Sequence, residues 1–246
     1  MTSVSEASNG SAASAWERIE HSVKGIHGWT PIDQLFALFV LTISSREIRG
    51  DIVEVGSWCG RSAVVLASAA KIIGNVNVHC IDLFPEKRDW KQNRDGTYSF
   101  ETVIDGTVYK GNQQQTVWKD AFETQTLKAY HSHDSILECF TENVKSRNLE
   151  DIVKPFRGDL PSFSQEVGGD FRCRLAFLDG DHGYDAVCQD IQTVEKFLSP
   201  GGWICFDDAF SSYDGVDKAI TELVIQSPNF ECFQQLTRKF FVARKR

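Results

Sequence analysis

Acidic side chains follow several short apolar runs in this sequence, at the positions where each run ends. Asp82 follows one run, Asp179 follows another, and Asp207 with Asp208 follows a third. Carboxylates accept hydrogen bonds from hydroxyl groups, hold cations and exchange protons. His182, three residues after Asp179, adds a side chain of a type that titrates near neutral pH. We therefore expect the polar residues at the ends of these runs to form the functional site.

A segment with two glycines, Glu54 to Gly60, follows the first apolar run and reads Glu-Val-Gly-Ser-Trp-Cys-Gly. A dinucleotide-binding loop needs glycine at its first, third and sixth positions, so that the backbone can approach a pyrophosphate. Counted from Gly56 as the first glycine, Trp58 stands at the third position. The segment fails that test, which disfavours an NAD-dependent oxidoreductase.

Strands and helices that alternate along the chain must position these residues. The predicted strands are 51–55, 76–82, 152–157, 174–179, 202–207 and 236–244, and the predicted helices are 31–46, 60–71, 135–147, 184–198 and 214–225. This alternation indicates an α/β fold, a doubly wound and mostly parallel sheet with helices on both faces. Ligands of such sheets bind beyond the carboxyl ends of the strands, where the acidic residues lie.

Residues 85–133 interrupt this alternation with an aromatic-rich, charge-balanced insertion. A long insertion after the second strand would lie over the ligand-binding edge, and its aromatic residues indicate a lid that orders on a substrate. Residues 1–14 are small and polar, which predicts a disordered tail. We therefore expect a single domain, residues 15–246, with a lid insertion at 85–133.

Composition excludes several classes of partner. The 246 residues include 26 Lys and Arg against 34 Asp and Glu, a net charge of −8, whereas nucleic-acid binding needs a surplus of cations. The longest apolar stretch, residues 35–41, is too short to span a membrane. The seven cysteines form no CxxC pair, which fits a reducing compartment. We expect a cytoplasmic protein without a nucleic-acid or membrane partner.

The pattern E-x-G-x-x-x-G, followed by an acid at the end of the next strand, resembles the class I S-adenosylmethionine-dependent methyltransferases. The resemblance implies a Rossmann-like sheet of seven strands. It also implies that the glycine loop passes beneath the methionine part of the cofactor, that Asp82 binds the ribose hydroxyls and that Gly158-Asp159 contacts adenine. The cofactor-binding residues so implied are Glu54, Gly56, Ser57, Gly60, Asp82, Gly158, Asp159 and Asp179.

Two downstream segments, residues 177–185 and 198–208, resemble the metal-dependent small-molecule O-methyltransferases of the macrocin, sugar-methylating type. By this resemblance Asp179, Asp207 and Asp208 hold a metal. Oxygen ligands without thiolates suit Mg²⁺ or Mn²⁺, and three converging carboxylates would repel one another without a cation. The resemblance further implies Asp179 and His182 as catalytic residues, with His182 as the base, and a hydroxylated small molecule such as a sugar or natural product as the acceptor.

Two other functions stay open at this point: a metal-independent small-molecule methyltransferase, and a non-catalytic cofactor-binding partner subunit. Methylation of nucleic-acid bases is disfavoured, because the proline-rich (N/D)PPY turn of those enzymes is absent after residue 178. The helix at 31–46 is apolar enough to bury a face against a second subunit in a homo-oligomer, or simply to pack on its own sheet.

Overall fold

The computed structural model of the protein describes residues 14–110 and 116–246. A seven-stranded sheet forms its centre, in the order β6-β2-β1-β7-β8-β10-β9. These strands are β1 (Asp51–Val55), β2 (Val78–Asp82), β6 (Val153–Arg157), β7 (Cys173–Leu178), β8 (Leu198–Phe206), β9 (Phe230–Gln235) and β10 (Phe241–Lys245). The first five are parallel, and β10 runs antiparallel to β8 and β9. The predicted mostly parallel, seven-stranded Rossmann-like sheet is confirmed.

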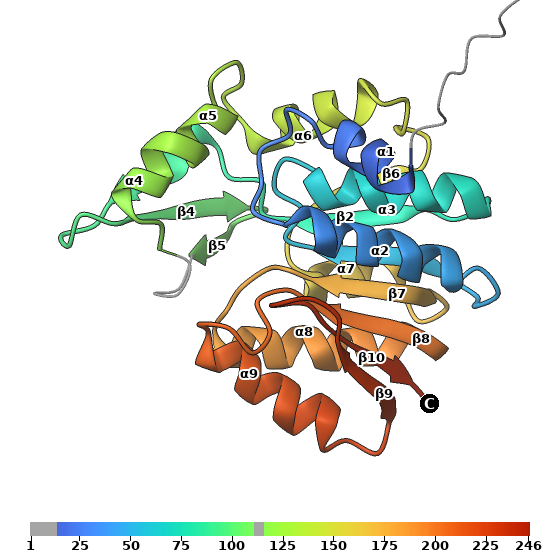
Figure 1. The fold of residues 1–246 in the computed structure, drawn as a ribbon. Coiled ribbons are helices and arrows are strands. Elements are labelled where there is room, and N and C mark those ends of the chain that lie inside the picture. The colour runs from blue at the N-terminus through green and yellow to red at the C-terminus, as the bar shows by residue number, and fades with distance from the viewer. Residues whose placement is uncertain (1–13, 111–115) are drawn as a thin grey trace, which may run out of the picture.

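Helices cover both faces of this sheet (Figure 1). One face packs on α2 (Ile32–Ser44), α3 (Arg61–Ile73) and α6 (Ile136–Lys145), and the other on α7 (Leu160–Val167), α8 (Tyr184–Phe197) and α9 (Asp214–Ile220), which continues as a π-helical turn (Thr221–Ile225). Successive strand residues point to opposite faces, so Ile52 belongs to the first core and Val53 to the second. Both side chains are fully buried.

Strand β1 lies between β2 and β7, where the strand order reverses. Because β2, β1, β7 and β8 are parallel, their carboxyl ends meet at one edge of the sheet. The acidic residues that follow these strands are therefore brought together, although they are distant in the chain. This edge is where ligands of doubly wound sheets bind.

The insertion at 85–133 has regular structure of its own, where the sequence indicated only a lid. It contains a 3₁₀ turn (Lys87–Asp89), β3 (Trp90–Gln92), β4 (Tyr98–Ile104), β5 (Thr107–Lys110), α4 (Lys119–Ala121), a π-helical turn (Phe122–Thr126) and α5 (Leu127–Ala129). The three strands form a small antiparallel sheet beside the main one (Figure 1). The rings of Tyr98 and Phe122 stack with centroids 3.8 Å apart, and the Trp90 ring lies 5.2 Å from that of Phe122. These three aromatic residues thus form a local core for the insertion.

Both chain ends differ from the predicted elements. The predicted tail at 1–14 lies outside the described residues except for Ser14, whose side chain caps an unpredicted helix, α1 (Ala15–Ser22). The predicted strand at 236–244 is wrong in its first half, because residues 236–240 form the turn between β9 and β10. Leu236 N–H donates to the Phe240 carbonyl at 2.8 Å and closes this turn.

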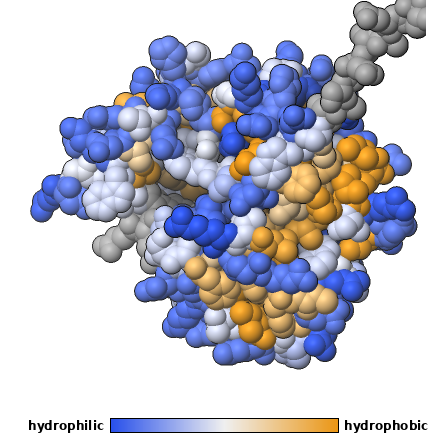
Figure 2. Space-filling view, in the orientation of Figure 1, coloured by the Kyte–Doolittle hydropathy of each residue, from blue (hydrophilic) through white to orange (hydrophobic). Residues whose placement is uncertain are grey.

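No helix of the described residues is long and apolar enough to cross a membrane. Helix α2 keeps part of its apolar surface accessible: Phe36 and Phe39 are half-buried and Val40 is exposed. Apolar side chains gather on the face of the molecule that α2 occupies (Figure 2). A homo-oligomer through this helix stays a prediction.

Candidate active site

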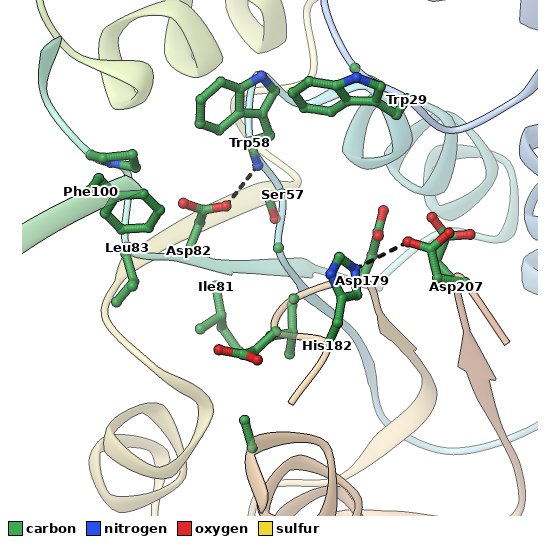
Figure 3. A pocket seen from close by; sticks show the side chains of 18 of the residues that line it. Trp29, Ser57, Trp58, Ile81, Asp82, Leu83, Phe100, Asp179, His182 and Asp207 are labelled. Atoms are coloured by element: carbon green, nitrogen blue, oxygen red, sulfur yellow. Dashed lines mark hydrogen bonds and ion pairs between the residues drawn. The ribbon is translucent and has the colours of Figure 1, made fainter. Parts of the chain in front are cut away.

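A cavity of about 640 Å³ opens at the carboxyl edge of the sheet, between the strand ends and the insertion. Nine of the residues predicted for the site line it: Gly56, Ser57, Asp82, Gly158, Asp159, Asp179, His182, Asp207 and Asp208. Figure 3 shows Asp82 toward one side of the cavity and Asp179, His182 and Asp207 toward the other. The cavity therefore has two halves, one lined by Asp82 and the other, the acidic half, lined by Asp179, Asp207 and Asp208.

Gly56 holds the loop after β1 against the end of β7. Its φ of +86° is unfavourable for a residue with a side chain, and a Cβ there would lie 1.9 Å from the Asp179 carbonyl oxygen. Gly56 N–H donates to the Ile81 carbonyl, and Asp179 N–H donates to that of Val55, both at 2.9 Å. The glycine is thus required by contact between two strand ends.

Glu54 and Gly60 lie behind the cavity wall, so the structure does not bring these two predicted cofactor residues to the cavity itself. Glu54 is fully buried, and burial raises the pKa of its carboxyl, an effect that the Ser57 and Ser62 hydroxyls partly offset. Gly60, with φ +88°, precedes the first residue of α3, and a Cβ there would lie 3.0 Å from the Phe140 ring. Both residues therefore support the loop without lining the cavity.

Asp82 presents its carboxylate to the cavity while two backbone groups orient it. Trp58 N–H donates to Oδ2 at 2.8 Å (Figure 3). Phe84 N–H donates to Oδ1 at 2.6 Å. Burial raises the pKa of Asp82, and these two donors offset part of that rise. Each oxygen keeps a second lone pair, so the carboxylate can also accept hydrogen bonds from two hydroxyls of a ligand.

Gly158 and Asp159 carry β6 into α7 beside Asp82. Gly158 N–H donates to the Asp82 carbonyl at 3.0 Å, and the Asp159 side chain caps α7 by accepting from Ser162 N–H at 2.9 Å. The sequence missed Asp190 on α8, which also lines this part of the cavity. Burial, reinforced by the charge of Asp159, raises the pKa of Asp190 to about 7.

Asp179, Asp207 and Asp208 converge at the acidic half of the cavity. Each offers one oxygen atom, and these atoms lie within 4.8 Å of one another. Burial and the neighbouring Asp207 carboxylate raise the pKa of Asp179 well above its ordinary value. Three hard oxygen donors from two strand ends fit Mg²⁺ or Mn²⁺, and a cation would relieve the repulsion at Asp179.

The sequence missed a cation that lies among these acids. Lys239, in the turn before β10, places its Nζ 2.9 Å from Asp207 Oδ2 and 3.0 Å from Asp208 Oδ1. Burial favours the neutral amine, but the charges of Asp207 and Asp208 raise the pKa of Lys239 above its ordinary value. Convergence of the acids does not by itself require an external cation, because the chain supplies one.

Two more polar contacts complete the cluster. Gln34, a buried residue of α2, donates from Nε2 to Asp207 Oδ1 at 2.8 Å. His182 Nε2 lies 3.1 Å from Asp208 Oδ2, and its ring stacks on Tyr213 with centroids 3.9 Å apart. Burial opposes ionisation of Asp208, but the hydrogen bond with His182 and the charge of Lys239 hold its pKa below the usual range.

The tautomer of His182 follows from these contacts. With Nε2–H donating to Asp208, the lone pair of the neutral ring lies on Nδ1, which is buried and has no hydrogen-bond partner among the described residues. Transfer of a proton from a ligand to this ring therefore requires the imidazole to turn. Asp208 would then stabilise the imidazolium that forms.

Aromatic side chains line the outer part of the cavity. Trp29 is half exposed and its ring lies 5.9 Å from that of Trp58, and Trp118 of the insertion is largely exposed. Arg61 anchors the segment that carries Trp29, since its Nε donates to the Thr30 carbonyl at 3.0 Å. Nothing local in the sequence marks Trp29 or Arg61 for this role, because they meet only in the folded chain.

Comparisons with known proteins agree with this fold. A family model described as a methyltransferase domain matches residues 53–209. A relative from Streptomyces olivaceus, 8-demethyl-8-(2,3-dimethoxy-alpha-L-rhamnosyl)-tetracenomycin-C 4'-O-methyltransferase, is 24% identical over 200 residues, or 78% of this chain. The chain matches 64% of that relative's length, which is less than two thirds.

Solved structures show the same fold. The O-methyltransferase NovP superposes with a TM-score of 0.63 at 15% identity, covering 89% of this chain and 82% of NovP. An O-methyltransferase from Bacillus cereus, in complex with SAH, superposes with a TM-score of 0.56 at 16% identity, covering 94% of this chain and 90% of that structure's chain. Since the family model matches more than half of the chain, and the motifs and fold agree with it, this protein belongs to the class I S-adenosylmethionine-dependent methyltransferases.

Proposed function

We propose that this chain transfers a methyl group from S-adenosylmethionine to a hydroxyl of a small molecule, assisted by Mg²⁺ or Mn²⁺ at Asp179, Asp207 and Asp208. The observation that carries the proposal is that one cavity is lined both by Asp82 and by this acidic cluster. A donor site and an acceptor site that share one cavity allow direct transfer between two bound molecules.

The cofactor half is assigned to the loop after β1 and to Asp82. S-adenosylmethionine supplies an electrophilic methyl carbon on a sulfonium. Asp82 accepts the two ribose hydroxyls, with Trp58 N–H and Phe84 N–H keeping its carboxylate in orientation. Gly158 and Asp159 border the space for adenine, and the loop at Gly56 and Ser57 borders the methionine part.

The acidic half is assigned to the acceptor. When bound there, a divalent cation lowers the pKa of a hydroxyl and holds its oxygen in place. His182 takes the hydroxyl proton after its ring turns, and the nearby carboxylate of Asp208, which His182 contacts before the turn, stabilises the resulting positive charge. The insertion and the segment at Trp29 exclude water from the reacting atoms.

A sugar or another hydroxylated natural product is the proposed acceptor. The name of the Streptomyces olivaceus relative gives a rhamnosyl-tetracenomycin as its substrate. The exposed faces of Trp29 and Trp118 suit the apolar face of a sugar ring or a fused aromatic system. The net charge of −8 is consistent with a small-molecule substrate, and the seven free cysteines are consistent with the cytoplasm.

Metal-independent transfer is the second candidate, because one observation favours it. Lys239 already neutralises part of the charge of Asp207 and Asp208. In that case the acids and Lys239 would only shape the acceptor site, and His182 would remove the proton without help.

Chelation separates the two candidates. Methyl transfer from S-adenosylmethionine is measured across a panel of sugars and phenols, with and without EDTA. We expect EDTA to abolish transfer and excess Mg²⁺ to restore it, since no other group would then lower the pKa of the hydroxyl. Full activity in EDTA would establish the metal-independent candidate. Thermal shifts with S-adenosylhomocysteine and with NAD provide the control on cofactor class.

Substitution of Asp82 tests the cofactor half. Asp82→Ala is expected to weaken binding of S-adenosylhomocysteine by roughly 1.5–3 kcal/mol, because hydrogen bonds to a charged acceptor are lost. Asp82→Asn keeps one acceptor oxygen for the loop and should lose less affinity than Asp82→Ala. Calorimetric titration measures both, and an unchanged affinity in folded Asp82→Ala protein would remove this residue from the site.

A further inference from the structure

Every carboxylate oxygen of Asp207 and Asp208 already has a partner within the chain. Gln34 Nε2 donates to Asp207 Oδ1 at 2.8 Å, and His182 Nε2 lies 3.1 Å from Asp208 Oδ2. The other two oxygens face the ammonium of Lys239, at 2.9 and 3.0 Å. Each oxygen keeps a second lone pair, so a divalent cation that binds these two acids must approach beside a group that is already there.

Among these partners Lys239 is the one whose charge opposes a second cation. Mg²⁺ binds oxygen at about 2.0–2.1 Å, so the metal and the ammonium cannot share the same side of two carboxylates. Two positive charges a few ångströms apart in a partly buried site also repel strongly. Gln34 carries no charge, and His182 carries none while its imidazole is unprotonated, so both can keep their hydrogen bonds beside a metal.

The backbone of Lys239 is held in place while its side chain can leave the acids. Ala209, directly after the acidic pair, donates from its N–H to the Lys239 carbonyl at 3.0 Å. The hydrogen bond from Leu236 N–H to the Phe240 carbonyl closes the same turn. The Lys239 side chain lines the cavity and is 20% exposed, so rotation about its own bonds would bring the ammonium into the cavity.

We propose that Lys239 is an internal counter-ion that competes with the divalent cation for Asp207 and Asp208, so that metal binding displaces its ammonium into the cavity. The inference rests on the metal site of the proposed function. Without metal, Lys239 keeps the converging acids from repelling one another. With metal, the displaced ammonium lies beside the space assigned to the acceptor.

Binding of Mn²⁺ to the full chain tests this competition without any assay of activity. Electron paramagnetic resonance measures the free Mn²⁺ that remains during a titration. Lys239→Met and Lys239→Gln remove the charge, and we expect both to bind Mn²⁺ about tenfold more tightly or better. Lys239→Arg keeps the charge and should bind like the wild type. Lys71→Met removes an exposed charge on α3 and should also leave binding unchanged.

Thermal melting adds a second readout. Without metal, Lys239→Met should melt below the wild type because its acids have lost their counter-ion, and Mg²⁺ should raise its Tm by more than that of the wild type. Equal Mn²⁺ affinity in Lys239→Met, Lys239→Gln and wild type would overturn the inference and leave the metal site standing. Absence of saturable Mn²⁺ binding in every variant would overturn the inference together with the metal part of the proposed function.

Discussion

Replacing His182 by alanine is expected to lower kcat by roughly 10²–10⁴-fold, the usual contribution of a general base, with little change in affinity for S-adenosylhomocysteine. The ring contacts Asp208 and stacks on Tyr213 in the acidic half of the cavity. Asp82, assigned to the cofactor, is held by separate contacts with Trp58 and Phe84. Single-turnover kinetics and calorimetric titration measure the two effects separately.

His182→Gln provides a matched variant, because its amide can still donate to Asp208 but cannot act as a base near neutral pH. It should be nearly as slow as His182→Ala. His133→Ala serves as a control, since His133 contacts Glu142 on α6 and is not among the described residues that line the cavity. A rate for His182→Ala near that of the wild type would leave removal of the proton to the metal or to solvent.

Gly56→Ala is expected to destabilise the protein by roughly 2–6 kcal/mol, the sum of the penalty for a side chain at positive φ and of overpacking. The added Cβ would lie 1.9 Å from the Asp179 carbonyl oxygen, which is backbone and cannot rotate away. Displacement of the end of β7 would also move Asp179, so methyl transfer should fall with stability. Urea denaturation measures the change in the free energy of unfolding.

Gly74→Ala is the matched control for this prediction. Gly74 also has a positive φ, +73°, but among the described residues no atom beyond its own chain neighbours lies within 4 Å of a Cβ at that position. Gly74→Ala should lower the free energy of unfolding only by the penalty for a side chain at positive φ, roughly 1–3 kcal/mol. If both substitutions cost the same, contact with Asp179 is not the reason for glycine at position 56.

Much of the fold could be predicted because its signals are local. Apolar runs of strand length alternate with helical periodicity, and this pattern depends only on neighbouring residues. The insertion was harder to predict, since its aromatic residues have no clear periodicity and its core forms through contacts such as that of Tyr98 with Phe122. The turn at 236–240 was missed because the apolar residues around it continue the alternation of a strand.

The sequence by itself determined the parallel strands of the sheet, the loop glycines and the acids at the strand ends, because parallel strands bring their carboxyl ends to one edge. Only the tertiary structure decided which partners those acids have. Gln34 reaches Asp207 across 173 positions, and Lys239 reaches Asp208 across 31. Neither residue has a local pattern that marks it, because such contacts depend on how a helix and a turn pack against the finished sheet. The charge balance of the acidic cluster is therefore a property of the fold.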